Sequence, residues 1–271
     1  MVDNPKKKER TTDLVIKAVL QGFRAIDTAC QPKHYREDLV GDALVVLQDT
    51  YSIKREALFL QTKFTSITGQ DTSKPLPYDP KDSVREQILS SFQVSLKNLR
   101  TNYLDSYILH SPLNTLKETI EAWRTLMQLQ DEGKTRVIGL SNAYDPRLIK
   151  SLHEIRKVQV VQNRWYEGNH WDKEVCRFCL EDGIQYQSFW TLTGSPSLIE
   201  HPTLVTLAKK TSCTPAQVIY KLAQMRGITP LAGSTNEKRM EDGVKTAELD
   251  LNLDPECDDA IQSLNAFIDE D

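Results

Sequence analysis

The chain has 271 residues, of which 27% are charged and 39% hydrophobic, and its formal net charge is −4. This length suits one α/β barrel, and the small negative charge provides no basic surface for nucleic acid. No apolar run approaches the roughly 18 residues of a membrane helix, and residues 1–5 lack the apolar segment of a signal peptide. We therefore expect a cytoplasmic protein that binds neither nucleic acid nor a membrane.

Apolar strand-like segments alternate with longer amphipathic segments along the chain. The predicted strands cover residues 23–29, 57–64, 105–111, 136–142, 158–164, 185–191 and 229–235. The predicted helices cover residues 11–21, 38–49, 82–100, 114–132, 145–156, 172–182, 214–225, 236–247 and 255–267, after a polar N-terminal tail. Such alternation is typical of parallel strands joined by right-handed crossovers. Because no Pro/Gly-rich linker interrupts it, we expect residues 1–271 to form one domain.

Small and capping residues mark several predicted helix ends. Gly22 and Gly133 are placed to end helices, and Asp82 and Asp145 are plausible N-caps. Thr214 precedes a proline at a first helical position.

Cys176 and Cys179 form a C-x-x-C pair inside a predicted helix. Neither a second pair nor spaced histidines complete a metal site, so we expect helix thiols and no metal. Unpatterned cysteines also favour a reducing compartment.

Polar residues end three successive predicted strands. Asp27 ends the first strand, Lys63 the second and His110 the third, and Tyr35 lies in the loop after the first. In a barrel the carboxyl ends of the strands converge on the face that carries active sites. We interpret these four residues together as a catalytic group.

The chemistry of this group suits protonation of a carbonyl oxygen. A phenol has a pKa near 10 and is a weak acid at neutral pH unless its anion is stabilised. An ammonium group from Lys63 would stabilise that anion, Asp27 would hold the ammonium, and His110 would contact the substrate oxygen. None of these side chains supplies hydride, so a reductase built on them needs a nicotinamide cofactor.

Three segments resemble signatures of the aldo-keto reductase family. The first is Gly22-Phe23-Arg24-Ala25-Ile26-Asp27-Thr28-Ala29, with residues 37–41 after it, and the second is Arg136-Val137-Ile138-Gly139-Leu140-Ser141-Asn142. The third is a degraded match, Leu231-Ala232-Gly233-Ser234 followed by Arg239.

The resemblance implies an (α/β)8 TIM-type barrel that reduces small aldehydes or ketones with NADPH. Asp27, Tyr35, Lys63 and His110 match its catalytic positions. The positions that match cofactor-binding residues of the family are Ser141, Asn142, Gln162, Phe189, Trp190, Leu192, Ser234 and Arg239. Ser141, Asn142 and Gln162 match positions that hold the carboxamide, and Phe189 matches the stacking aromatic residue. Residues 190–194 match the loop that covers the pyrophosphate, and Ser234 and Arg239 match the 2′-phosphate site.

The chain departs from the family pattern in four places. Tyr35 lies eight residues after Asp27, whereas the family's tyrosine usually lies five residues after its aspartate, a position that Pro32 occupies in this chain. The loop between Asp27 and Tyr35 must therefore bulge to bring Tyr35 back. His34 is an alternative acid that we rank below Tyr35. Gly233 replaces a phosphate-binding cation, so NADH use is possible. From the resemblance we also expect the N-terminal hairpin, the first barrel strand and the long C-terminal loop to be missing, which would favour an open substrate site.

Two other functions remain open at this stage. One is a nicotinamide-binding regulatory or truncated protein with impaired catalysis, which the missing first strand favours. The other is a lyase that forms a Schiff base on Lys63. For the assembly state we expect a monomer or a weak oligomer.

Overall fold

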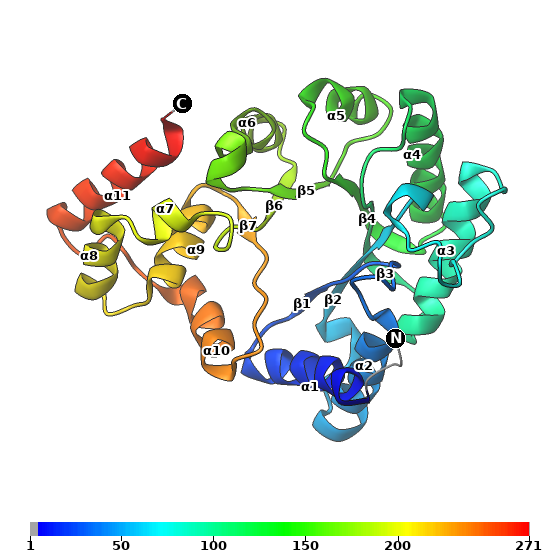
Figure 1. Cartoon of the computed structure of the whole chain (residues 1–271), viewed down its shortest axis with the longest axis horizontal. Coiled ribbons are helices and arrows are strands. Elements are labelled where there is room, and N and C mark those ends of the chain that lie inside the picture. Colours follow the sequence, from blue (N-terminus) through cyan, green and yellow to red (C-terminus); the bar gives the residue numbers. More distant parts are fainter. Residues whose placement is uncertain (1–4, 271) are drawn as a thin grey trace. The chain divides into compact units, whose positions relative to one another are not determined.

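The computed structural model describes residues 5–270. The chain divides into two compact units, one formed by residues 1–143 and 147–160, and the other by residues 144–146 and 161–271. Figure 1 shows the elements of both units in chain order, and the prediction of a single domain stays a prediction.

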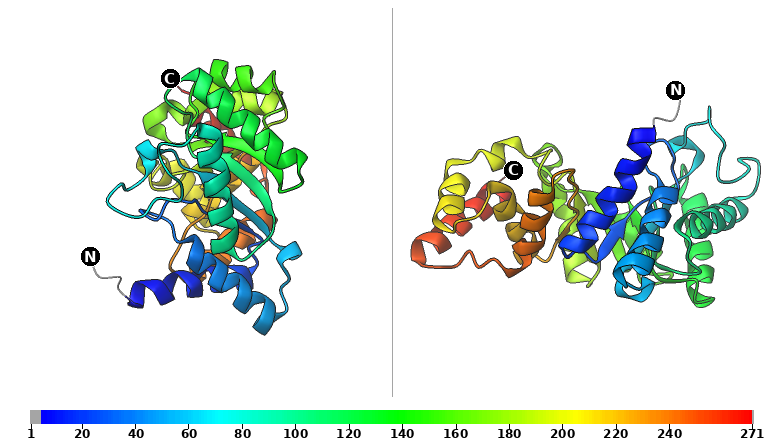
Figure 2. Two further views of the ribbon diagram at one scale, coloured as in Figure 1. Left: turned by 90° about the vertical axis from the view of Figure 1, so that its right-hand side faces the viewer. Right: turned by 90° about the horizontal axis from the view of Figure 1, so that it is seen from below.

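The first unit holds a parallel sheet with its strands in sequence order. These are β1 (Ala25–Asp27), β2 (Phe59–Phe64), β3 (Leu104–Leu109) and β4 (Thr135–Ser141). Its helices are α1 (Pro5–Gln21), α2 (Glu37–Tyr51), α3 (Val84–Leu99), α4 (Leu116–Asp131) and α5 (Pro146–His153), with the short turns η1 (Arg55–Ala57) and η2 (Ile67–Gly69). Figures 1 and 2 show α1 beside α2, where the Thr12 hydroxyl donates to the Leu39 carbonyl at 3.0 Å.

Local sequence explains where these helices end. Gly22 has φ 123° after α1 and Gly133 has φ 69° after α4, both in the region that favours glycine. The predicted cap of α3 was wrong by one residue. Ser83, not Asp82, caps α3, because the Ser83 hydroxyl accepts from the Glu86 backbone while the Glu86 carboxylate accepts from the Ser83 backbone.

The predicted polar tail is also partly wrong, because residues 5–10 are the first turns of α1. Residues 1–4 lie outside the described residues. Between residues 5 and 24 there is no strand, and β1 is the first of the seven strands in the described part of the chain.

The two faces of β2 have different neighbours. Thr62 points to the helical side, where its hydroxyl donates to the Glu37 carboxylate of α2 at 2.6 Å. Tyr107 of β3 packs on the same side against Phe92 of α3, with ring centroids 5.0 Å apart. Because side chains alternate along a strand, Lys63 lies on the opposite face.

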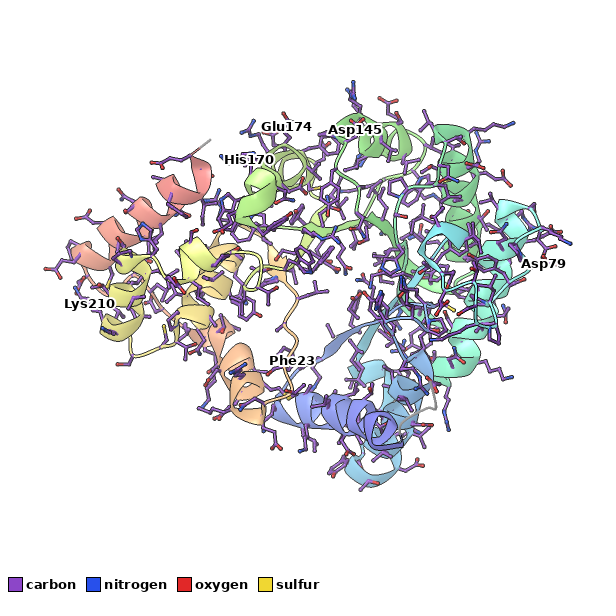
Figure 3. The ribbon with its side chains drawn as sticks, in the orientation of Figure 1. Phe23, Asp79, Asp145, His170, Glu174 and Lys210 are labelled. Atoms are coloured by element: carbon purple, nitrogen blue, oxygen red, sulfur yellow. The ribbon has the colours of Figure 1, made fainter. Side chains whose placement is uncertain are left out.

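The second unit contains β5 (Val160–Arg164), β6 (Gln185–Phe189) and β7 (Thr229–Pro230), and β6 pairs with β7 in parallel. Its helices are α6 (Lys173–Glu181), α7 (Pro196–Ile199), α8 (Pro202–Lys210), α9 (Pro215–Met225), α10 (Glu237–Lys245) and α11 (Pro255–Asp269), with the turns η3 (Glu167–Asp172) and η4 (Thr246–Glu248). Lys210 joins α8 to the start of α11, binding Asp254 at 2.8 Å and Glu256 at 2.6 Å (Figure 3).

The helices α7 and α8 were not predicted, and the strand predicted at residues 229–235 is longer than β7. Pro196 and Pro202 lie at the first helical positions of α7 and α8, and a proline at that position is a sequence signal for the start of a helix. Residues 231–235 form a loop that follows β7.

None of the helices within residues 5–270 is long and apolar enough to cross a membrane.

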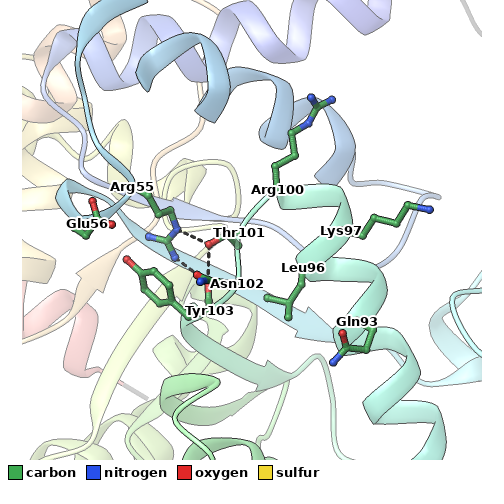
Figure 4. A pocket seen from close by; sticks show the side chains of 9 residues that line it. All are labelled: Arg55, Glu56, Gln93, Leu96, Lys97, Arg100, Thr101, Asn102 and Tyr103. Atoms are coloured by element: carbon green, nitrogen blue, oxygen red, sulfur yellow. Dashed lines mark hydrogen bonds between the residues drawn. The ribbon is translucent and has the colours of Figure 1, made fainter. Parts of the chain in front are cut away.

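A buried charge cluster lies at the start of β2 and β3. Asp105 is 3% exposed and pairs with Arg55 at 2.7 Å and with Arg136 at 3.0 Å. It also accepts from the Leu60 backbone at 2.9 Å. Arg55 is 12% exposed, lies 4.2 Å from the Tyr103 ring centroid and donates to Thr101 (Figure 4).

We expect Asp105→Ala to lower the free energy of unfolding by about 3–5 kcal/mol, because it leaves Arg55 buried without its carboxylate. Arg136 is 62% exposed, so Arg136→Ala is the matched control, with a loss below about 1 kcal/mol. Urea unfolding at neutral pH measures both, and equal losses would contradict this interpretation.

Candidate active site

Lys63 and Asp27 form a close ion pair at the ends of β2 and β1. The Lys63 ammonium Nζ lies 2.7 Å from each Asp27 carboxylate oxygen and 2.8 Å from the Thr28 carbonyl oxygen. The Lys63 side chain is 0% exposed and the Asp27 side chain 22%. A buried ammonium without such acceptors would cost several kcal/mol.

Tyr35 lies next to this pair despite its longer loop. Its ring centroid is 5.4 Å from Nζ of Lys63 and 5.7 Å from the His110 ring, which it meets edge-on at 71°. The loop makes a turn in which the Gln31 carbonyl accepts from the backbone of both His34 and Tyr35. The structure thus brings Asp27, Lys63, Tyr35 and His110 together, while His34 is exposed.

Two side-chain contacts hold the loop before Tyr35. Gln31 Nε2 donates to the Gly69 carbonyl at 2.7 Å, and Gln70 Nε2 donates to the Cys30 carbonyl at 2.9 Å. The loop is therefore tied to the segment that follows β2.

His110 is held by Thr65, whose Oγ1 lies 2.7 Å from Nδ1 of the ring. Burial, with a further contribution from the nearby Lys63 charge, lowers the pKa of His110 from 6.5 to about 4. The imidazole is therefore neutral near pH 7, with one nitrogen that donates and one that accepts.

Three supporting residues were not found from the sequence. Gln61 donates to Asp27 at 2.8 Å, Ser106 donates to Gln61 at 2.8 Å, and Thr65 contacts His110. The signal was available, because Gln61 and Lys63 alternate along β2 and so share a face, and Thr65 continues the alternation directly after the strand.

Ser141 and Asn142 close β4 in the same unit. Ser141 is buried, and Asn142 has φ 52°, a conformation that asparagine tolerates. The Asn142 amide donates to the His110 carbonyl at 2.8 Å. This contact fixes the end of β4 against the end of β3.

The other predicted cofactor residues lie in the second unit. Gln162 is buried on β5, and its amide donates to Gln187 of β6 at 2.9 Å. Phe189 ends β6 and is half-buried, as is Leu192 in the next loop. Trp190 is 51% exposed and has φ 61°.

The loop after β6 has features of a binding segment. Ser195 is 0% exposed, and its hydroxyl has no partner within the described residues. Such an orphaned donor fits a polar ligand group, and Ser195 was not predicted from the sequence as a binding residue. A Cβ at Gly194 would come within 2.7 Å of the Tyr166 side chain, so the ring lies directly on this backbone.

Ser234 and Arg239 lie around the start of α10. The Ser234 hydroxyl accepts from the Asn236 backbone at 3.0 Å, and the Arg239 side chain is exposed. A Cβ at Gly233 would meet open space. An exposed guanidinium fits a phosphate group.

The cysteine pair lies on α6, where Cys176 and Cys179 are both buried. Burial raises the pKa of Cys176 to about 12 and raises that of Cys179 further. No group of three or more His, Cys, Asp or Glu side chains within residues 5–270 is arranged to hold a metal ion.

Comparison with known proteins identifies the family. The sequence profile of the aldo/keto reductase family matches residues 2–266. The chain is 29% identical to a glyoxal reductase of Bacillus subtilis over 256 residues, which cover 94% of this chain and 83% of that one. It is 28% identical to prostaglandin F synthase 1 of Bos taurus over 281 residues, with 93% and 81% covered.

Solved structures agree on the fold. An aldo/keto reductase from Brucella melitensis matches with a TM-score of 0.76 and 26% identity, over 95% of this chain and 90% of that one. A Bombyx mori aldo-keto reductase in complex with NADP matches with a TM-score of 0.78 and 22% identity, over 96% and 83%.

The chain therefore belongs to the aldo-keto reductase family, and it is an NAD(P)H-dependent oxidoreductase with that family's barrel-type α/β fold. The family's cofactor is NADP(H), which the donor set of the second unit fits.

We expect the His110 imidazole to titrate near pH 4 in two-dimensional NMR of the folded protein. The unfolded chain, with the ordinary pKa of 6.5, takes up the proton first, so stability falls as pH drops from 6.5 to 4. Relative to His110→Gln, the wild type should lose on the order of 2–3 kcal/mol over that window. An imidazole midpoint near 6.5 would contradict this expectation.

Proposed function

We propose that the protein is an NADPH-dependent reductase of small aldehydes and ketones, with Tyr35 as the acid. The observation that carries the proposal is the position of the Tyr35 ring, 5.4 Å from a fully buried ammonium group. A cation at this distance lowers the free energy of the phenolate and makes the phenol a better acid. Positioned acid catalysis contributes on the order of 10²–10⁴ in rate.

The remaining residues hold the acid and the substrate. Asp27 orients Lys63, and Gln61 orients Asp27 in turn. In the Nε2–H tautomer of neutral His110, the Thr65 hydroxyl would donate to Nδ1, and Nε2–H would remain to donate to the substrate oxygen. Tyr35 O–H then transfers its proton to that oxygen.

The cofactor, when bound, supplies the hydride that the carbonyl carbon accepts. We propose that Ser141, Asn142 and Gln162 bind its carboxamide and that Phe189 stacks on its nicotinamide. The loop with Trp190 and Leu192 would cover the pyrophosphate, to which the orphaned Ser195 hydroxyl could donate.

We propose that Ser234 and Arg239 bind the 2′-phosphate of NADPH. Because Gly233 replaces a cation there, we expect the preference for NADPH over NADH to depend on Arg239. The cytoplasmic location and the monomeric or weakly associated state stay predictions.

The geometry of Lys63 argues against Schiff-base chemistry. Its Nζ donates to three oxygens at 2.7–2.8 Å, so it is held as an ammonium donor and presents no free amine. A regulatory protein with impaired catalysis would instead bind NADPH tightly and fail to turn over an aldehyde panel.

Tyr35→Phe should lower kcat for aldehyde reduction by at least 10²-fold, because the proton donor is removed, and it should leave the Kd for NADPH within about twofold. His34→Gln is the matched control, since it removes the adjacent exposed residue, and it should retain kcat within about threefold. NADPH oxidation at 340 nm and fluorescence titration measure both parameters. Normal turnover in Tyr35→Phe, or loss in His34→Gln, would reject Tyr35 as the acid.

A further inference from the structure

Arg164 places a positive charge against the aromatic residues proposed to bind the cofactor. It is the last residue of β5, and its guanidinium carbon lies 5.1 Å from the Phe189 ring centroid and 4.6 Å from that of Trp190. Both distances are within the range of a cation–π interaction. No role was predicted for this arginine from the sequence.

Several contacts fix the guanidinium in this place. The Tyr144 hydroxyl lies 3.2 Å from the Arg164 backbone nitrogen and 3.4 Å from Nη1. The Trp165 backbone donates to the Phe189 carbonyl at 3.1 Å, which sets β5 against β6. Tyr166 meets Trp190 edge-on at 5.6 Å. The arginine and the rings thus form one packed cluster within the second unit.

We infer that Arg164 makes the site discriminate against the oxidised cofactor, so that NADPH binds in preference to NADP⁺. This inference rests on the proposed stacking of nicotinamide on Phe189. The oxidised nicotinamide ring carries a positive charge and the reduced ring does not. If the guanidinium and the nicotinamide lie on opposite faces of the Phe189 ring, the guanidinium weakens the attraction between that ring and a stacked cation. If they lie on the same face, the guanidinium repels the cationic nicotinamide directly.

The size of the effect follows from distance. A charge 5.1 Å from the Phe189 centroid lies within roughly 5–9 Å of any ring stacked on that residue. At an effective dielectric constant between those of a protein surface and of water, repulsion at that range changes the affinity for NADP⁺ by about three- to tenfold. Weaker binding of the oxidised form would favour product release in the reductive direction.

The experiment compares the Kd values of the two redox forms in variants of Arg164. Arg164→Met and Arg164→Gln remove the charge, and Arg164→Lys, the matched control, retains it without the planar stack. NADPH is titrated by its own fluorescence, and NADP⁺ by calorimetry, both on the protein without substrate.

The titrations are run at pH 8, where the neighbouring acid has a fixed charge. Arg164 shares a hollow of about 540 Å³ with Asp172, and His170 and Glu174 on its wall are labelled in Figure 3. Burial raises the pKa of Asp172 to about 6, although Asn163 and Tyr186 each donate to it at 2.7 Å.

We expect the ratio Kd(NADP⁺)/Kd(NADPH) to fall about three- to tenfold in Arg164→Met and Arg164→Gln, and to stay within about twofold in Arg164→Lys. A purely structural role would weaken both forms alike and leave the ratio unchanged. An unchanged ratio in the charge-removing variants, or an equal fall in Arg164→Lys, overturns the inference.

Failure of the proposed function gives a different result. If the wild type binds neither cofactor form, or binds NADPH and reduces no carbonyl in a panel, the proposed reductase activity is rejected. If the wild type binds and reduces normally while the ratio does not respond to Arg164, only the role of Arg164 is rejected.

Discussion

The ion pair between Lys63 and Asp27 is the interaction on which the candidate site depends. The Lys63 ammonium is completely buried, and its three acceptors, two carboxylate oxygens and the Thr28 carbonyl, match its three N–H donors. Removing one partner of such a pair leaves an uncompensated charge and costs more than the pair contributes. The ends of β1 and β2 are therefore constrained to this geometry.

A compensated pair acts on its surroundings as a dipole, so its effect on Tyr35 falls steeply with distance. His110 adds no charge, because its lowered pKa keeps it neutral. The position of the Tyr35 ring therefore decides how strongly Lys63 can stabilise a phenolate. The turn closed on the Gln31 carbonyl and the hydrogen bonds from Gln31 and Gln70 supply that position, so the longer loop is compatible with the chemistry proposed for Tyr35.

The strands and the polar residues at their ends could be predicted because both depend on short segments of the sequence. The alternation of side chains along β2 determines the face on which Lys63 lies. The apolar segments between the amphipathic ones predict the positions of β1 to β4. The supporting contacts could not be predicted in the same way, because Ser106 reaches Gln61 only through the register of β3 on β2. The helix α8 was missed for another reason, since a short amphipathic run after Pro202 carries little periodic signal.

Two cations of the candidate sites, Lys63 and Arg164, have different surroundings, and we propose that they act in opposite senses. Lys63 is matched by a carboxylate and lies near a phenol, where it lowers the cost of forming an anion. Arg164 lies over two aromatic rings, and we infer that its positive charge raises the cost of a second positive charge stacked on them. In the proposed reductase, which forms an oxidised, cationic cofactor, the first effect would assist proton donation and the second would assist departure of that cofactor.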